Sequence, residues 1–252
     1  MDSLTLSLLT SSSSSSSSSL PSPKRRRLPP TTKAQQHPLP EEIRVCTNRT
    51  CRRQGSFQTL HTLSSLSPPN LQVNPCACLG RCGAGPNLLL LPDAVFVGHC
   101  ATPARAAELM ASLFPGEFDA QSGLDALALR KRAEVEFDEG NFTQAELLLS
   151  QVIDLNPFGG LHITFKFRSS VRLELGNYSG ALQDANEALK LAPRYYEAYI
   201  CQGDAFLALN QFHSAEQSYL AALDIDPSIR RSKSFKARIA KLQEKLADAN
   251  TT

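Results

Sequence analysis

The spacing of apolar residues divides the chain into a strand-rich part and a helical part. Between residues 41 and 114 the apolar runs are short and are separated by turn-forming residues, which is typical of strands. The order strand, helix, strand, hairpin, helix predicts a small α/β sandwich. The expected strands are Ile43–Val45, Leu71–Val73, Leu88–Leu91 and Val95–Val97, and the expected helices are Phe57–Leu66 and Thr102–Leu113.

From residue 124 to residue 249 the pattern is helical throughout and repeats itself. The letters GNFTQA from Gly140 recur as GNYSGA from Gly176 and as NQFHSA from Asn210, at spacings of 36 and 34 residues. Each copy is followed by a helix that a proline closes. A period near 34 residues, with two helices in each period, is the signature of tetratricopeptide (TPR) repeats. The predicted repeats are 124–158, 159–193 and 194–227.

Small residues mark the places where the two helices of a repeat cross closely. Ala145, Ala181 and Ala215 hold equivalent places in the three copies, and Gly203 serves the same need in the third repeat. The final segment, 228–249, is amphipathic and is predicted to be the capping helix that the end of a solenoid requires.

The first 40 residues differ from the rest in composition. They contain an unbroken serine run, Ser11–Ser19, a basic cluster, Lys24–Arg27, and a single acid, Asp2. We expect this segment to be disordered, because it cannot bury enough apolar surface, and to be an organellar transit peptide. The density of serine favours the chloroplast, either in the stroma or attached peripherally to the thylakoid, with the mitochondrion and the nucleus as alternatives. A linker, 115–123, is expected between the two folded parts.

Charge, hydropathy and motifs exclude three classes of function. The chain carries 26 Lys and Arg against 24 Asp and Glu, and five of the bases lie in the first 40 residues, so the remainder lacks the basic footprint of a nucleic-acid-binding protein. No apolar run is long enough for a transmembrane helix. The sequence has no phosphate loop, no dinucleotide fingerprint and no convincing nucleophile–base pair, because no acid stands near His99–Cys100. We therefore predict a protein that is not an enzyme.

Four of the seven cysteines form two pairs with the spacing of a metal site. Cys46 and Cys51 are separated by four residues, and Cys78 and Cys82 by three. Thiolates from two such loops can hold a [2Fe–2S] cluster or a tetrahedral zinc. Neither pair has the two-residue spacing of a zinc ribbon, which favours iron–sulfur chemistry over zinc. A site that has lost its metal is the third alternative.

The residues around these cysteines resemble a known family. Cys46-Thr47 with Gly55-Ser56, and Cys78-Leu79-Gly80 with the following Gly85-Pro86, are similar to the thioredoxin-like [2Fe–2S] ferredoxins and to the 24-kDa-type subunit of respiratory complex I. The resemblance covers residues 42–114 and implies a thioredoxin-like ferredoxin fold. It also implies that Cys46, Cys51, Cys78 and Cys82 are the cluster ligands. Cys76 is an extra thiol that can substitute for one of them.

The whole arrangement also resembles a group of plant chloroplast proteins, in which TPR repeats follow a ferredoxin-like domain. The array is similar in length to the TPR subclass that clamps the C-terminal carboxylate of chaperones with basic and asparagine side chains. In the register of the glycine turns, Arg130 keeps a basic group, whereas Glu134 and Phe167 replace the clamp asparagines and Gln202 replaces a lysine. Because Glu134 would repel a carboxylate, we predict that chaperone tails do not bind. The candidate groove residues for another protein client are Arg130, Glu134, Phe167, Arg168, Tyr199 and Gln202.

Two hypotheses for the function follow from these patterns. In the first, the protein is a plastid assembly or scaffold factor whose TPR repeats bind a client and whose ferredoxin-like domain carries the cluster. In the second, it is an electron-transfer or cluster-carrying protein that its TPR repeats dock to a redox partner. The repeats occupy about half of the chain and are a binding device, which favours the first hypothesis.

Overall fold

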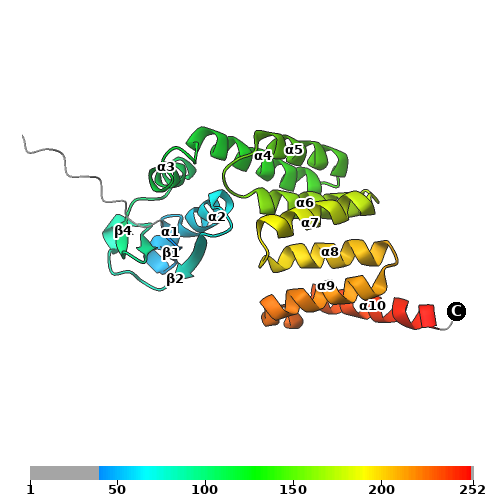
Figure 1. Ribbon diagram of the computed structural model, residues 1–252. Coiled ribbons are helices and arrows are strands. Elements are labelled where there is room, and N and C mark those ends of the chain that lie inside the picture. The colour runs from blue at the N-terminus through cyan, green and yellow to red at the C-terminus, as the bar shows by residue number, and fades with distance from the viewer. Residues whose placement is uncertain (1–39, 251–252) are drawn as a thin grey trace, which may run out of the picture. The chain divides into compact units, whose positions relative to one another are not determined.

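The structure, a computed structural model, describes residues 40–250 (Figure 1). The predicted transit peptide lies outside the described residues, apart from Pro40. None of the helices in the described part is both long and apolar enough to cross a membrane.

The first folded part is a four-stranded sheet with three helices. Its strands lie in the order β2-β1-β3-β4, with β1 parallel to β2 and the other two pairings antiparallel. The elements in chain order are β1 (Glu42–Cys46), α1 (Arg49–Arg53), α2 (Ser56–Leu66), β2 (Gln72–Cys76), the short 3₁₀ turn η1 (Cys82–Ala84), β3 (Leu88–Leu91), β4 (Val95–Val97) and α3 (Pro103–Leu113). The predicted hairpin is thus present as β3 and β4.

The core of this sheet domain lies between β1, β3 and the helices α2 and α3. Ile43 and Val45 of β1 are fully buried and belong to one apolar cluster with Leu63 of α2 and Met110 of α3. Thr102 caps α3, because its hydroxyl accepts the backbone N–H of Arg105, as the sequence predicts.

Two elements differ from the prediction. Helix α1 was not expected, because its five residues have no apolar periodicity; the side chain of Asn48 caps it, and Cys51 anchors it by burial. Strand β2 runs through Pro75 to Cys76, further than predicted. A proline is tolerated there because β2 is an edge strand of the sheet.

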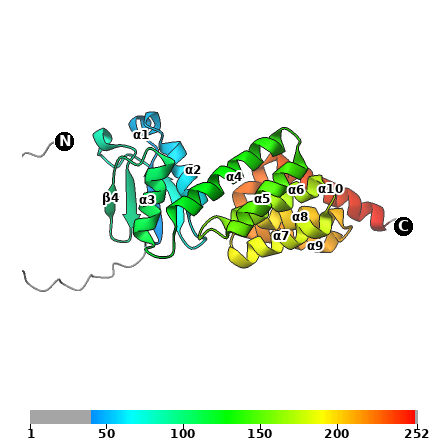
Figure 2. The same cartoon turned by 90° about the horizontal axis from the view of Figure 1, so that it is seen from above.

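The second folded part is a stack of seven helices (Figure 2). Three helix pairs form the TPR solenoid, and the last helix covers its end. They are α4 (Ala120–Asp138) with α5 (Phe142–Leu155), α6 (Leu161–Glu174) with α7 (Tyr178–Leu191), and α8 (Tyr196–Ala208) with α9 (Phe212–Ile225), followed by the 3₁₀ turn η2 (Pro227–Arg231) and α10 (Lys233–Asn250). Helix α4 begins inside the predicted linker, because the Asp119 carboxylate caps it at the backbone N–H of Ser122.

Direct contacts join the sheet domain to the first repeats. The backbone N–H of Gly160 donates to the carbonyl of Ser67 over 3.2 Å. A Cβ atom at Gly159 would overlap the carbonyl of Leu66. The chain between α5 and α6 therefore packs against the end of α2, and glycines make this close approach possible.

The predicted close crossings are present. Ala145, Ala181 and Ala215 are fully buried, and a Cβ atom at Gly203 would lie 2.5 Å from the ring of Tyr219. That ring is itself buried, and its hydroxyl donates to Asp204, so it has little room to move.

We expect Gly203→Ala to destabilise the protein by about 1–3 kcal/mol, because the added methyl overpacks the crossing. In an unconstrained helix, replacing glycine by alanine stabilises by about 1 kcal/mol. A decrease in the free energy of unfolding would therefore show that the methyl group is overpacked. Urea unfolding measures the difference. In a Tyr219→Leu background the ring is gone, and Gly203→Ala should no longer destabilise; a loss of equal size in both backgrounds would contradict this explanation.

Candidate functional site

The four cysteines predicted to bind a metal centre come from two loops of the sheet domain. Cys46 ends β1 and Cys51 lies in α1, and both are buried. Cys78 and Cys82 lie in the loop between β2 and β3, and both are exposed. The Cys46 thiol interacts with those of Cys51 and Cys78, and the sulfur atoms of Cys78 and Cys82 are 3.7 Å apart. The structure therefore links all four sulfur atoms through a chain of contacts.

Hydrogen-bond donors surround two of these thiols. Burial disfavours the thiolate of Cys46, but the backbone N–H groups of Asn48 and Leu79 donate to its sulfur, and on balance the pKa of Cys46 is lowered. Gly80 donates its backbone N–H to the sulfur of Cys78 over 3.4 Å. Such donors stabilise thiolates, which are the form that binds metals.

The other two thiols hold their protons more tightly. Burial raises the pKa of Cys51, although Asn87 donates to its sulfur from the backbone and from Nδ2. The neighbouring Cys78 thiol raises the pKa of Cys82. Thiols with a raised pKa remain protonated near neutral pH unless a cation holds them as thiolates.

The spacing of the Cys78 and Cys82 sulfur atoms can be compared with that of thiolates on a metal. Within residues 40–250, no three His, Cys, Asp or Glu side chains are arranged to hold a single metal ion. The 3.7 Å between the sulfurs of Cys78 and Cys82 is close to the separation of about 3.8 Å for two thiolates on one tetrahedral metal with bonds of about 2.3 Å. A [2Fe–2S] cluster needs two cysteines at each iron, whereas a structural zinc needs all its ligands on one ion. Because the Cys46 thiol interacts with Cys78 as well as with Cys51, the sulfur contacts alone do not choose between the two kinds of centre.

The three remaining cysteines have different surroundings. Cys76, the predicted substitute ligand, stands opposite Cys46 in the pairing of β1 with β2, and burial raises its pKa. Cys100 is buried, and burial raises its pKa to about 11, so its thiolate is scarce near neutral pH. Cys201 is buried in α8 beside the hydroxyl of Ser170.

Three of the predicted groove residues line one cavity of about 460 Å³. Glu134 of α4 and Phe167 of α6 border it, and so does Arg130. The guanidinium of Arg130 is buried, however, and donates to the backbone carbonyls of Ser65 and Gly160 over 2.6 and 3.4 Å. The prediction of Arg130 as a free basic group is therefore corrected: it ties α4 to the end of α2.

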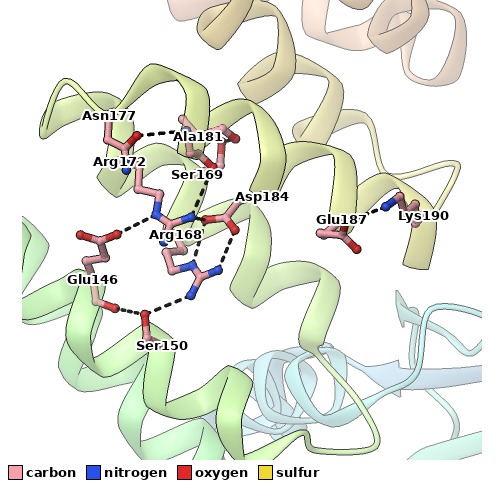
Figure 3. A network of polar contacts seen from close by, with 11 residues as sticks. Glu146, Ser150, Arg168, Ser169, Arg172, Asn177, Ala181, Asp184, Glu187 and Lys190 are labelled. Carbon is pink, nitrogen blue, oxygen red and sulfur yellow. Dashed lines mark hydrogen bonds and ion pairs between the residues drawn. The ribbon is translucent and has the colours of Figure 1, made fainter.

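Arg168 also has a different place from the one predicted. It forms two hydrogen bonds with the buried carboxylate of Asp184, which Arg172 contacts as well, and it donates to the hydroxyl of Ser150 (Figure 3). Arg172 in turn pairs with Glu146 over 2.6 Å. This network connects α5, α6 and α7, so Arg168 holds the repeats together and is not available to a client.

Tyr199 and Gln202 line a second, shallower hollow between α7 and α8, with a volume of about 780 Å³. The amide of Gln202 donates to Asn186 and accepts from Ser218. The six predicted groove residues thus fall into two hollows and one internal network, instead of one continuous groove.

The cavity beside Glu134 contains charged residues that the sequence did not point to. Lys131, Lys166, Glu197 and His61 all line it. The two lysines and Glu197 lie on the same three helices as the predicted residues. The alignment of the repeats on their glycine turns pointed to other positions of each helix, so it did not find them. His61 comes from α2 of the sheet domain, and no local pattern connects it with the repeats.

His162 gives the junction beside this cavity a dependence on pH. Burial lowers the pKa of His162 to about 4, helped by the charge of Arg130, and its Nδ1 atom has no hydrogen-bond partner among residues 40–250. The unfolded chain takes up a proton below about pH 6.5, but the folded protein does not until about pH 4. We therefore expect stability to be complete above pH 6.5 and to fall by roughly 1.4 kcal/mol for each pH unit below it.

Urea unfolding at pH 7.5, 6.0 and 4.5 measures this fall, and His162→Gln should make it shallower. His213 is exposed, so His213→Gln serves as the matched control and should leave the pH dependence as it is in the unaltered protein. Equal slopes in all three proteins would show that His162 does not carry the effect.

Comparisons with known proteins concern the helical part. Residues 168–228 match the family model of the tetratricopeptide repeat. A STIP1 homolog of Dictyostelium discoideum is 31% identical over 103 residues, which are 41% of this chain and 18% of that protein. An SGT1 homolog of Oryza sativa subsp. japonica is 30% identical over 121 residues, which are 48% of this chain and 31% of that protein. The chain thus spans less than a third of the length of these two relatives.

Solved TPR domains are similar to about half of this chain. The first TPR domain of human RPAP3 is 23% identical, with a TM-score of 0.46, and the match covers 51% of this chain and 97% of that domain. The first TPR of Spaghetti (RPAP3), solved with the HSP90 peptide SRMEEVD, is 24% identical, with a TM-score of 0.45, and the match covers 52% of this chain and 98% of that one. The family match at residues 168–228, together with the paired helices of this part of the chain, identifies it as a TPR solenoid.

The predicted exclusion of chaperone tails is wrong. Proteins similar to this chain include the heat shock protein STI1 of Saccharomyces cerevisiae, and similar TPR domains were solved with HSP90 and HSP70 tail peptides. The exclusion rested on the charge of Glu134 alone. The structure places Lys131 and Lys166 in the wall of the same cavity as Glu134 and Glu197, so Glu134 alone does not decide its charge.

Proposed function

We propose that this protein is a TPR scaffold whose sheet domain binds a [2Fe–2S] cluster through Cys46, Cys51, Cys78 and Cys82. The observation that supports it is the convergence of four thiols from two separate segments of the sheet domain. The strand order β2-β1-β3-β4 is consistent with the thioredoxin-like ferredoxin fold that the sequence resembles, and we include that fold in the proposal. The cluster would supply one-electron chemistry or structural support for the loops.

The residues of this chain have separate tasks in such a site. The four thiolates would bind the irons, and the N–H groups of Gly80 and Asn87 would donate to cysteine sulfur, which tunes the potential of a cluster. Cys46 and Cys51 are shielded by the core, whereas Cys78 and Cys82 are open to solvent. The exposed pair is therefore the side from which an electron or a cluster can be exchanged.

The experiment is an assay of the full chain purified without oxygen. Iron and acid-labile sulfide in equal amounts, with visible absorbance that dithionite bleaches, would support a [2Fe–2S] centre. Zinc in place of iron would support the alternative metal. A colourless protein without metal would leave a sheet domain that serves the scaffold only.

For the TPR part we propose that the repeats hold a protein client, and that a chaperone tail is the first client to test. Relatives named for organising Hsp70 and Hsp90 support this choice, as do Lys131 and Lys166 beside the cavity. The peptides SRMEEVD and SGPTIEEVD, which occupy similar TPR domains, are the probes. Lys131→Glu with Lys166→Glu should weaken the binding of either peptide at least tenfold. If neither peptide binds the unaltered protein, the client is of another kind.

The location and class of the protein complete the proposal. We place it in the chloroplast on the composition of residues 1–40, and we assign it a binding role instead of an enzymatic one. A fluorescent protein fused behind residues 1–40 should accumulate in plastids of leaf cells. Accumulation in mitochondria or nuclei would favour one of the alternatives.

A further inference from the structure

The loops that carry the four cysteines contain an unusual distribution of charge. Between Glu42 and Asp93 the chain has five arginines, no lysine and no acid. Four of these arginines stand next to the cysteines in sequence and are exposed: Arg49, Arg52, Arg53 and Arg81. Within the part of the chain that the structure describes, none of the four forms an ion pair. Their charge is therefore directed to solvent.

The structure places the four arginines on two neighbouring segments, whose exposed surface is here called the arginine face. Arg49, Arg52 and Arg53 belong to α1, and Arg81 immediately precedes η1. The two segments touch, because Nδ2 of Asn87 donates to the carbonyl of Arg81 over 2.6 Å and to the sulfur of Cys51, in α1, over 3.6 Å. The arginine face therefore lies on the same two segments that carry Cys51 and Cys82.

Apolar groups are interspersed with these charges. The guanidinium of Arg52 lies 4.9 Å from the ring centre of Phe57, and that of Arg81 lies 4.3 Å from that of Phe96. Both rings, together with Val95, are 40–49% exposed. Arginine and aromatic side chains are enriched in protein interfaces, whereas lysine is depleted there.

We propose that the arginine face is a docking surface for an acidic protein segment. Guanidinium groups bind carboxylates with two parallel hydrogen bonds, so a segment rich in Asp and Glu is the complementary partner. A single-stranded nucleic acid needs free aromatic faces for its bases, but guanidinium groups already cover a face of Phe57 and of Phe96. The partner would thus be bound next to the exposed Cys78 and Cys82.

This inference goes beyond the proposed function, because it depends on the arginines and not on a bound metal. The probe is a fluorescent peptide of twenty glutamates, and its affinity for the full chain is measured by anisotropy in 50 mM NaCl. We expect Arg52→Glu with Arg53→Glu to weaken binding at least tenfold. The matched control is Arg230→Glu with Arg231→Glu, an exposed arginine pair of η2, which should change the affinity less than twofold.

Several results would overturn the proposal. Equal losses in the two charge-reversed proteins would mean that only net charge matters, and no loss in the first would mean that the peptide binds elsewhere. Tighter binding of a twenty-nucleotide RNA, or of phosphatidylserine vesicles, with the same dependence on Arg52 and Arg53 would assign the face to those ligands.

If charge reversal unfolds the protein, Arg52→Gln with Arg53→Gln is the milder test, with an expected loss of at least threefold. Iron content is measured on the same samples. A protein that lacks metal but binds the peptide would contradict the proposed cluster and support the docking surface.

Discussion

Replacing Asp184 by asparagine should destabilise the protein by about 3–5 kcal/mol, because it leaves two arginines without their shared counter-charge. The carboxylate of Asp184 is 2% exposed; its two oxygens accept from Arg168 over 2.7 and 2.9 Å, and Arg172 lies 2.9 Å from one of them. The guanidinium groups are themselves only 14% and 18% exposed, so water cannot replace the lost partner. Asparagine keeps the shape but directs an amide NH₂ group at a donor (Figure 3).

Urea unfolding of the full chain measures this effect, and the same helix offers a matched control. Glu187 of α7 pairs with Lys190 on the surface, with exposed fractions of 37% and 70%, so Glu187→Gln should cost less than about 1 kcal/mol. In an Arg168→Met background, Asp184→Asn should cost clearly less than in the unaltered protein, because one interaction has already been removed. A loss below about 1 kcal/mol for Asp184→Asn alone would mean that the network is not what fixes α6 against α5 and α7.

The helical part shows how far local patterns lead. The repeated glycine turns and the small residues at the crossings are local signals, and Ala145, Ala181 and Ala215 are buried as they predict. Arg130 and Arg168 carry no such signal. Their partners lie 65 and 16 residues away, at Ser65 and Asp184, so only the packed fold reveals that both are internal.

The sheet domain follows the same rule. The apolar runs Leu88–Leu91 and Val95–Val97 identify the hairpin, because each is short and a turn separates them. Helix α1 has neither length nor periodicity; its stability comes from the cap at Asn48 and the burial of Cys51. The cysteine spacing predicts a metal site, but which sulfur atoms meet depends on how α1 and the loop after β2 come together.

Serine at a cysteine ligand should remove the metal completely, which is the largest effect expected for this protein. We expect Cys46→Ser and Cys82→Ser each to reduce iron from about two atoms per chain to almost none, because one iron would keep a single thiolate and the cluster would fall apart. Iron and acid-labile sulfide in protein purified without oxygen measure the loss. Thermal unfolding is a second readout, since a metal that binds only the folded state stabilises it.

Cys76 offers a control variant, and it also tests whether this thiol can replace one of the four proposed ligands. It stands opposite Cys46 and two residues before Cys78, so it is the thiol best placed to replace a lost ligand. Cys76→Ser alone should leave the iron content unchanged. If Cys78→Ser retains iron that Cys76→Ser with Cys78→Ser then loses, Cys76 is a working substitute. If every single variant keeps its iron, the four sulfurs do not form the site and the proposal of a cluster fails. The TPR scaffold is not affected by this result, because Cys201 is the only cysteine of the helical part.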